Sequence, residues 1–187
     1  MNALNRRLFG LALALALVAF PALAQQRFLD SKDAKEKDEP QKYLKDYDKL
    51  AKGKDANWVY FPEGSLKKYR TVTVKEFEEN GRERESRDAA RDGKDYMTQW
   101  LEKQGFKVVS SGAELTVEGN VFSAWEPHGG ARMWGWMANP GVGLEVMAKD
   151  SKGNVVGEIR HKARGSTVRD AVENGLEDVA KAIAMGR

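Results

Sequence analysis

The fold is decided by residues 114–122, ELTVEGNVF, in which apolar residues or glycine take every second position. A period of two is typical of a strand with one dry face. The same alternation returns in residues 142–148 and in residues 155–159, which are separated by DSKGN at residues 150–154. A glycine-containing turn between two such runs indicates a β-hairpin. We therefore expect three strands of one sheet here.

Two long helices are expected around these strands. Residues 90–104 carry an apolar stripe at helical spacing, and Gly105 takes the position where helices commonly end. In residues 168–183 the apolar positions recur at spacings of four, four, three and four. Thr167 is the expected N-cap of this second helix, with Asp170 reaching back to it.

Residues 70–77 and 106–109 predict two further strands, one on each side of the first helix. A strand, helix and strand in succession predict a parallel crossover. A short amphipathic helix at residues 43–50 must dock on the main body, and residues 58–62 are interpreted as an apolar plug over one end of the core. Residues 41–187 therefore predict a single α+β domain: a mixed sheet of about five strands with two long helices packed on one face.

The N-terminus has the pattern of a secretory leader. Two arginines in residues 5–7 precede an apolar run at residues 8–20, and ALA at residues 22–24 matches a signal-peptidase site. The run has 13 residues, and a membrane span needs about 20. We expect a signal peptide at residues 1–24, cleaved after Ala24, and a periplasmic or secreted protein. Residues 25–40 are charged and nearly free of apolar side chains, which predicts a flexible spacer.

Composition excludes several functions. The absence of cysteine rules out a disulfide framework, a thiolate metal site and a thioether-linked lipid. Loss of Arg6 and Arg7 with the leader lowers the 31 basic residues to 29, against 28 acidic ones. No single-sign field then remains to attract nucleic acid, so we expect no nucleic-acid partner.

The two histidines predict neither a metal site nor a cofactor. His161 follows the alternating register of the last strand, at the inner edge of the sheet or just beyond it, and its basic neighbours disfavour a cation. His128 has Glu126 two residues away, but zinc or copper needs three or four ligands. We interpret His128 as a surface loop residue.

The acidic residues give no catalytic assignment. Glu114, Glu118, Glu145 and Glu158 are expected on the polar, solvated faces of their strands. No serine-hydrolase, zinc-protease or phosphate-loop motif occurs. We expect no catalytic residues and no enzyme, with an envelope hydrolase that uses a carboxylate pair as a remaining alternative.

Residues 125–141, the Trp-rich loop, are the best functional candidate because they hold three of the five tryptophans. Tryptophan and arginine are the usual anchors of interfaces, and indole faces also stack on sugars. The alternative is that the indoles fold back as a lid over the open end of the sheet, and the sequence favours neither. The expected contact residues are Trp125, His128, Arg132, Trp134 and Trp136.

A family resemblance adds to this interpretation. YLKDYDKL at residues 43–50, followed by LKKYRTVTV at residues 66–74, resembles a family of small bacterial envelope proteins of unknown function, most of them lipoproteins. Residues 105–109 and the hairpin at 153–156 are similar to small α/β modules of outer-membrane-associated assemblies. The resemblance covers roughly residues 41–185 and implies an envelope location and a binding or assembly role. The chain departs from the family in lacking the lipidated cysteine.

The sequence therefore predicts a non-catalytic periplasmic or envelope protein that binds or assembles through the Trp-rich loop. The expected partner is another envelope protein, and association with the outer membrane or peptidoglycan is a further expectation. One alternative is a binder of cell-wall glycan or of a small ligand on the same tryptophan platform. The other alternative is an envelope hydrolase.

Overall fold

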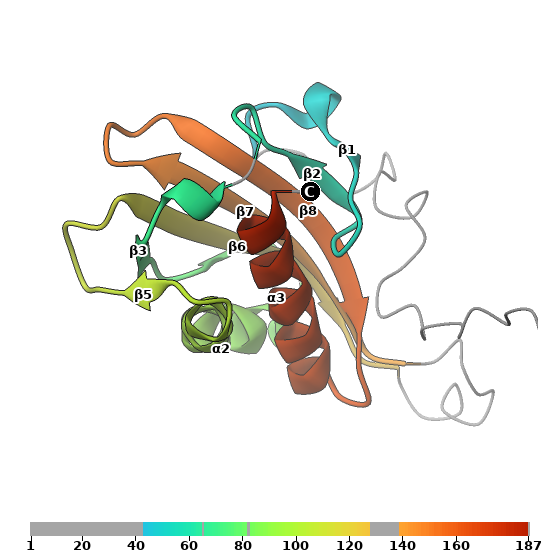
Figure 1. Ribbon diagram of the computed structural model, residues 1–187. Coiled ribbons are helices and arrows are strands. Elements are labelled where there is room, and N and C mark those ends of the chain that lie inside the picture. The colour runs from blue at the N-terminus through green and yellow to red at the C-terminus, as the bar shows by residue number, and fades with distance from the viewer. Residues whose placement is uncertain (1–42, 65, 82, 128–138, 187) are drawn as a thin grey trace, which may run out of the picture.

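The computed structural model describes residues 43–64, 66–81, 83–127 and 139–186. Over these ranges the chain forms one mixed sheet of eight strands with two long helices on one face (Figure 1). We call the face that carries the helices the inner face and the opposite one the outer face. The predicted α+β class, the single domain and the placement of both helices are confirmed.

The strands lie in the order β1-β2-β8-β7-β6-β3-β5, and β4 pairs with β6. The elements are η1 (Tyr47–Lys49), β1 (Ala51–Lys52), β2 (Trp58–Tyr60), η2 (Leu66–Lys68), β3 (Thr71–Val74), β4 (Glu78–Glu79), α2 (Arg84–Lys103), β5 (Lys107–Val108), β6 (Leu115–Trp125), β7 (Gly141–Asp150), β8 (Val155–Arg164) and α3 (Val168–Met185).

The strand count exceeds the expected five because the additional strands are too short to show a period. β1 and β4 have two residues each, and β2 has three. Residues 58–60, interpreted above as part of a plug, instead pair antiparallel with β8 through Val59 and Ile159. A three-residue strand gives only one and a half periods of alternation, so pattern alone does not separate it from a loop.

The three long strands confirm two predictions: the strand at residues 114–122 and the hairpin formed by residues 142–148 and 155–159. β6, β7 and β8 are antiparallel neighbours, and β3 pairs with both β5 and β6 in parallel, as the crossover predicted. A bulge in β6 at Phe122 and another in β8 at Val156 shift the register. Val156 enters the main core, and Val155 packs with the outer-face cluster, which reverses the face expected for Val155.

Both helix ends form as their sequences indicate. At the end of α2, the Gly105 N–H donates to the Glu102 carbonyl and the Phe106 N–H to the Leu101 carbonyl, with Gly105 at φ 92°. This pair of hydrogen bonds is a Schellman motif, and the positive φ explains the glycine. At the start of α3, the Asp170 N–H donates to the Thr167 hydroxyl over 3.0 Å.

Neither helix is long and apolar enough to cross a bilayer, and the same holds for every helix in the described ranges. α2 covers the β6 side of the inner face, and α3 covers β7 and β8 (Figure 1). The core between these layers is one continuous apolar cluster. The charged residues 84–88 form the first turns of α2, and Glu83 takes the N-cap position.

The N-terminal segment, Tyr43–Leu50, lies on the outer face and is not the helix that its apolar spacing predicted. Only Tyr47–Lys49 forms a 3-10 turn. The N–H groups of Tyr43 and Leu44 donate instead to the Tyr47 hydroxyl, over 3.0 and 3.1 Å. Leu44 and Leu50 of the segment pack with Met147 of β7 in a small apolar cluster. Burial against the sheet therefore replaces helical hydrogen bonding.

Phe77 fixes the distance between α2 and the sheet. Its ring lies between Gly93 of α2 and Gly119 of β6, where a Cβ added at either glycine would come within 2.8 and 2.1 Å of the ring, respectively. Gly93, which weakens the helix by about 1 kcal/mol relative to alanine, is therefore explained by close packing.

We expect Gly119→Ala to lower the free energy of unfolding by about 1–3 kcal/mol, because the added methyl group overpacks the Phe77 ring. Urea denaturation measures this, with Gln99→Ala on the exposed side of α2 as the control, where a change within about 0.5 kcal/mol is expected. In Gly119→Ala/Phe77→Leu the losses should be smaller than additive. An unchanged urea midpoint for Gly119→Ala would contradict this packing.

Candidate functional site

Of the five predicted contact residues, the structure places one. Trp125 is the last residue of β6 and is half-buried on the outer face. Its indole lies over Gly141, where a Cβ would stand 2.0 Å from the ring atom Cζ2. The other four lie outside the described residues, and their contacts remain predictions: His128, Arg132, Trp134 and Trp136.

The base of the Trp-rich loop is tied to three strands. Trp125 pairs with Gly141, and Gly141 pairs with Arg164 on its other side. Beyond the last pair, the Gly165 N–H donates to the Pro140 carbonyl over 3.0 Å. The loop therefore begins and ends on hydrogen-bonded backbone from β6, β7 and β8, and its ends are held in fixed positions.

The outer face next to this base carries aromatic and basic side chains. Arg160, Lys162 and Arg164 alternate along β8, opposite Glu145, Gly143 and Gly141 of β7. The bulge in β6 turns Phe122 onto the same face, where its ring lies beside Gly143. The Arg160 guanidinium stands 3.9 Å from the centre of that ring, which is a cation–π contact.

Glu145 is fully buried on this face, which corrects the expectation that it is solvated. Its carboxylate forms an ion pair with Arg160 and accepts hydrogen bonds from the Tyr47 hydroxyl, over 2.7 Å, and from the Asn120 amide, over 3.0 Å. Burial raises the pKa of the Glu145 carboxyl, and Arg160 with these donors acts against that rise. Burial and the bond to Glu145 raise the pKa of Tyr47 to about 12, so its hydroxyl remains a donor.

Glu158 is also fully buried, and it too was expected in solvent. Its two carboxylate oxygens accept the backbone N–H groups of Lys45 and Asp46, over 2.7 and 2.9 Å. The alternation along β8 placed Glu158 on the correct face. It could not show that the N-terminal segment covers this face. Glu114 and Glu118 are exposed and partly exposed, as expected.

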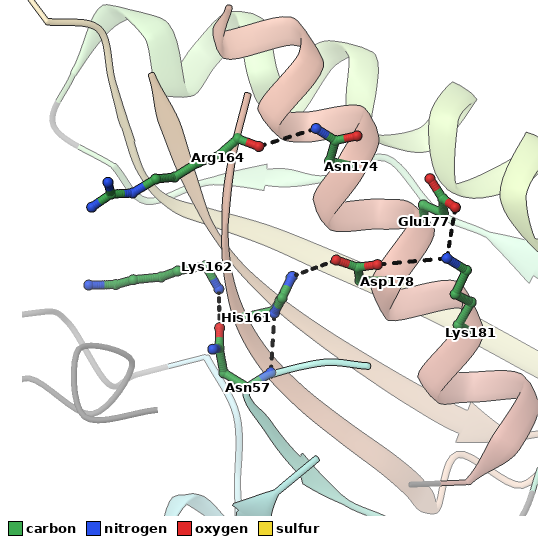
Figure 2. Close-up of polar contacts among 8 residues, drawn as sticks. All are labelled: Asn57, His161, Lys162, Arg164, Asn174, Glu177, Asp178 and Lys181. Atoms are coloured by element: carbon green, nitrogen blue, oxygen red, sulfur yellow. Dashed lines mark hydrogen bonds and ion pairs between the residues drawn. The ribbon is translucent and has the colours of Figure 1, made fainter. Parts of the chain in front are cut away.

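A second polar network lies on the inner face, around His161 (Figure 2). The Asn57 N–H donates to His161 Nδ1 over 3.2 Å, and the Lys162 N–H donates to Asn57 Oδ1 over 2.7 Å. His161 Nε2 stands 3.6 Å from Asp178 Oδ2 of α3. His161 is completely buried, well inside the sheet rather than at its edge. The network joins β2, β8 and α3.

The His161–Asp178 pair has the residue types of an acid–base dyad but not the access. His161 Nδ1 accepts a backbone N–H, and both side chains are sealed between β8 and α3. A general base must reach the proton it removes, and nothing from solvent reaches this one. The pair is therefore structural. No three His, Asp or Glu side chains in the described ranges stand close enough to share a metal ion.

Asn57 and Asp178 were missed by the sequence interpretation, although Asp178 left a signal. It follows Leu176 by two positions and precedes Val179, which places a carboxylate beside the apolar stripe of α3. His161 occupies a core position of β8 two residues after Ile159. Polar residues at core positions of two elements indicate a buried pair, because burying either one alone costs free energy.

Comparison with known proteins shows the fold but no family. No family model matches the chain, and neither does any curated protein. Two solved structures of PelC dodecamers from Paraburkholderia phytofirmans match with TM-scores of 0.54, for a form with one substitution, and 0.53. Both are 18% identical to this chain, covering 69% of it and 98% of the PelC chain. At this identity the likeness concerns the fold alone.

A weaker structural match is to a DUF4136 family protein from Bacteroides thetaiotaomicron. It has a TM-score of 0.38 and 9% identity, and it covers 72% of this chain and 100% of the other.

We expect Glu158→Gln to loosen the N-terminal segment while the sheet and helices stay folded. A hydrogen bond to a charged group contributes about 1.5–3 kcal/mol. The amides of Lys45 and Asp46 should therefore exchange with deuterium roughly ten to a hundred times faster. Hydrogen-exchange mass spectrometry measures this. Glu118→Gln, on the same face but paired with Lys75 and Lys149, is the control. Unchanged exchange at both amides would contradict the assignment.

Proposed function

We propose that this protein is a non-catalytic binding and assembly module of the bacterial cell envelope, and that the Trp-rich loop is its contact surface. The observation that carries the proposal is the base of the loop. Two strand pairings reach the base, Trp125 with Gly141 and Gly141 with Arg164, and the Pro140–Gly165 hydrogen bond adds a third tie. A binding loop needs such a scaffold, because a fixed base lowers the entropy lost on binding.

The remaining chemistry of the described residues supports binding rather than catalysis. The buried carboxylate of Glu145 is engaged by Arg160, and that of Glu158 by backbone N–H groups. A carboxylate pair for hydrolysis needs one group free to hold or accept a proton at a substrate. His161 is closed off inside the domain. These contacts favour a structural role for Glu145, Glu158 and His161.

The charge beside the loop suggests the character of its partner. Glu126, the residue after Trp125, lines a cleft of about 170 Å³ together with Glu85, Asp88 and Asp92 of α2. Arg169 is the one cation among the described residues that line this cleft, so acidic side chains are in excess. Complementary charge guides encounter and suppresses wrong partners. A partner that contacts the tryptophans should therefore bring a basic patch to this cleft.

The envelope location rests on the leader expected at residues 1–24 and on the absence of cysteine. The partner is an envelope protein, and a second copy of this chain is the first candidate to test. The PelC structures with the same fold are dodecamers.

The test uses Trp134→Ala/Trp136→Ala in the mature chain. We expect the variant to stay folded by circular dichroism and to lose the partner, with a fall in affinity of at least about thirtyfold, because a central tryptophan contributes about 2 kcal/mol or more. Light scattering across a concentration series measures self-association. Photo-crosslinking from position 131 in intact cells captures any other envelope partner.

The matched control is Trp100→Ala, since this half-buried indole lies on α2 under Lys103, away from the loop. It should keep the complex. Equal association of the parent chain and the double variant would contradict the proposal. Quenching of indole fluorescence by soluble muropeptides, lost in the double variant, would instead favour the glycan-binding alternative.

A further inference from the structure

A pocket of about 310 Å³ lies at the far end of the helices from the Trp-rich loop, between the end of α2, the end of α3 and the start of β3. We call it the basic pocket. Its size falls at the lower end of the range for small-molecule sites. Lys67 and Arg70 contribute cationic side chains, Tyr69 and Phe106 aromatic walls, and Gln104 an amide. None of the described residues that line it is acidic.

The helix ends would oppose an anion here, but their carbonyls are largely satisfied. The C-terminus of a helix carries a partial negative charge on its unpaired carbonyl groups. At the end of α2, the carbonyls of Trp100, Leu101 and Glu102 accept N–H groups from residues 104–106. At the end of α3, the Gly186 N–H donates to Ala182 over 2.8 Å. Each lining cation carries a full charge, against about half a charge at the end of a helix.

Two nearby carboxylates already have partners, and one of them, Glu114, lies at Arg70 itself. Glu114 accepts the backbone N–H groups of Arg70 and Thr71, over 2.6 and 3.1 Å, and these bonds lower its pKa. Glu63 forms an ion pair with Lys68. Next to the pocket residues in the sequence, Lys103 and Lys107 are exposed cations and Glu102 is an exposed anion. This end of the molecule therefore offers an excess of cations around an aromatic-walled cavity.

An exposed methionine lies next to the pocket in the sequence. Met185 follows Ala184, which lines the pocket, and its side chain is 40% exposed. It is the only large apolar side chain in the described ranges that is classed as exposed. A single exposed apolar side chain is ordinary on a protein surface, so the residues that line the pocket, and not Met185, carry the inference.

We propose that the basic pocket binds a small organic anion: a carboxylate or phosphate group on a ring-sized body. Arg70, with Lys67, holds the anionic group, because a guanidinium matches the two oxygens of a carboxylate or phosphate. Tyr69 and Phe106 contact the ring, as aromatic walls do in sugar sites. The Gln104 amide forms a hydrogen bond with a hydroxyl group of the ligand. This site is separate from the Trp-rich loop and does not depend on the function proposed for it.

The test is a titration of the ¹⁵N-labelled mature chain followed by NMR. Glucuronate and glucose 6-phosphate carry the two anionic groups on one kind of ring, and glucose is their neutral match. We expect either anion, at millimolar concentration, to shift the amide signals of Tyr69 and of residues 104–106, and glucose to shift none. Arg70→Ala should weaken binding at least about tenfold, as loss of a charged contact does.

Lys75→Ala is the matched control, because Lys75 is also an exposed cation and pairs with Glu118 away from the pocket. It should leave the affinity within about twofold. The proposal is overturned if neither sugar anion shifts these signals, or if inorganic phosphate or chloride produces the same shifts. It is also overturned if only phosphatidylglycerol vesicles bind in an Arg70-dependent way, since the surface would then contact membrane.

Discussion

The ion pair between Glu145 and Arg160 is the constraint on which the outer face depends. Both side chains are 1% exposed. Removing two charges from water costs several kcal/mol per ion, and their attraction offsets this only when hydrogen bonds occupy the remaining sites. Tyr47 and Asn120 donate hydrogen bonds to the Glu145 carboxylate, and the Phe122 ring lies against the Arg160 guanidinium. The Tyr47 hydroxyl also accepts two N–H groups of the N-terminal segment, so the pair and the segment stabilise each other.

This constraint decides where recognition can take place. The inner face is closed by α2 and α3, and half of the outer face is closed by the N-terminal segment. Buried polar groups of these faces are paired inside the domain, Glu145 with Arg160 and His161 with Asp178. The two proposed recognition sites lie at opposite ends of the domain: the base of the Trp-rich loop and the basic pocket.

Alternation and helix capping were sufficient to predict the layers of this fold. Thr167 and Gly105 marked helix ends that the structure confirms, because a cap is a local interaction. The same reasoning failed for Glu145 and Glu158. A period of two shows which face a residue occupies, but not what covers that face, and the cover comes from a segment about a hundred residues earlier in the chain. The basic pocket was missed for the same reason, since its walls come from three separate elements.

The central claim is that the indoles of Trp134 and Trp136 face solvent at the end of a rigid sheet and form the contact surface. ¹⁵N-indole NMR with a soluble paramagnetic probe tests it most directly, because each of the five tryptophans gives its own signal. The claim predicts strong relaxation of the Trp134 and Trp136 signals and much weaker relaxation of the half-buried Trp58 and Trp125. Equal protection of all five signals would mean that the loop folds back as a lid, and would contradict it.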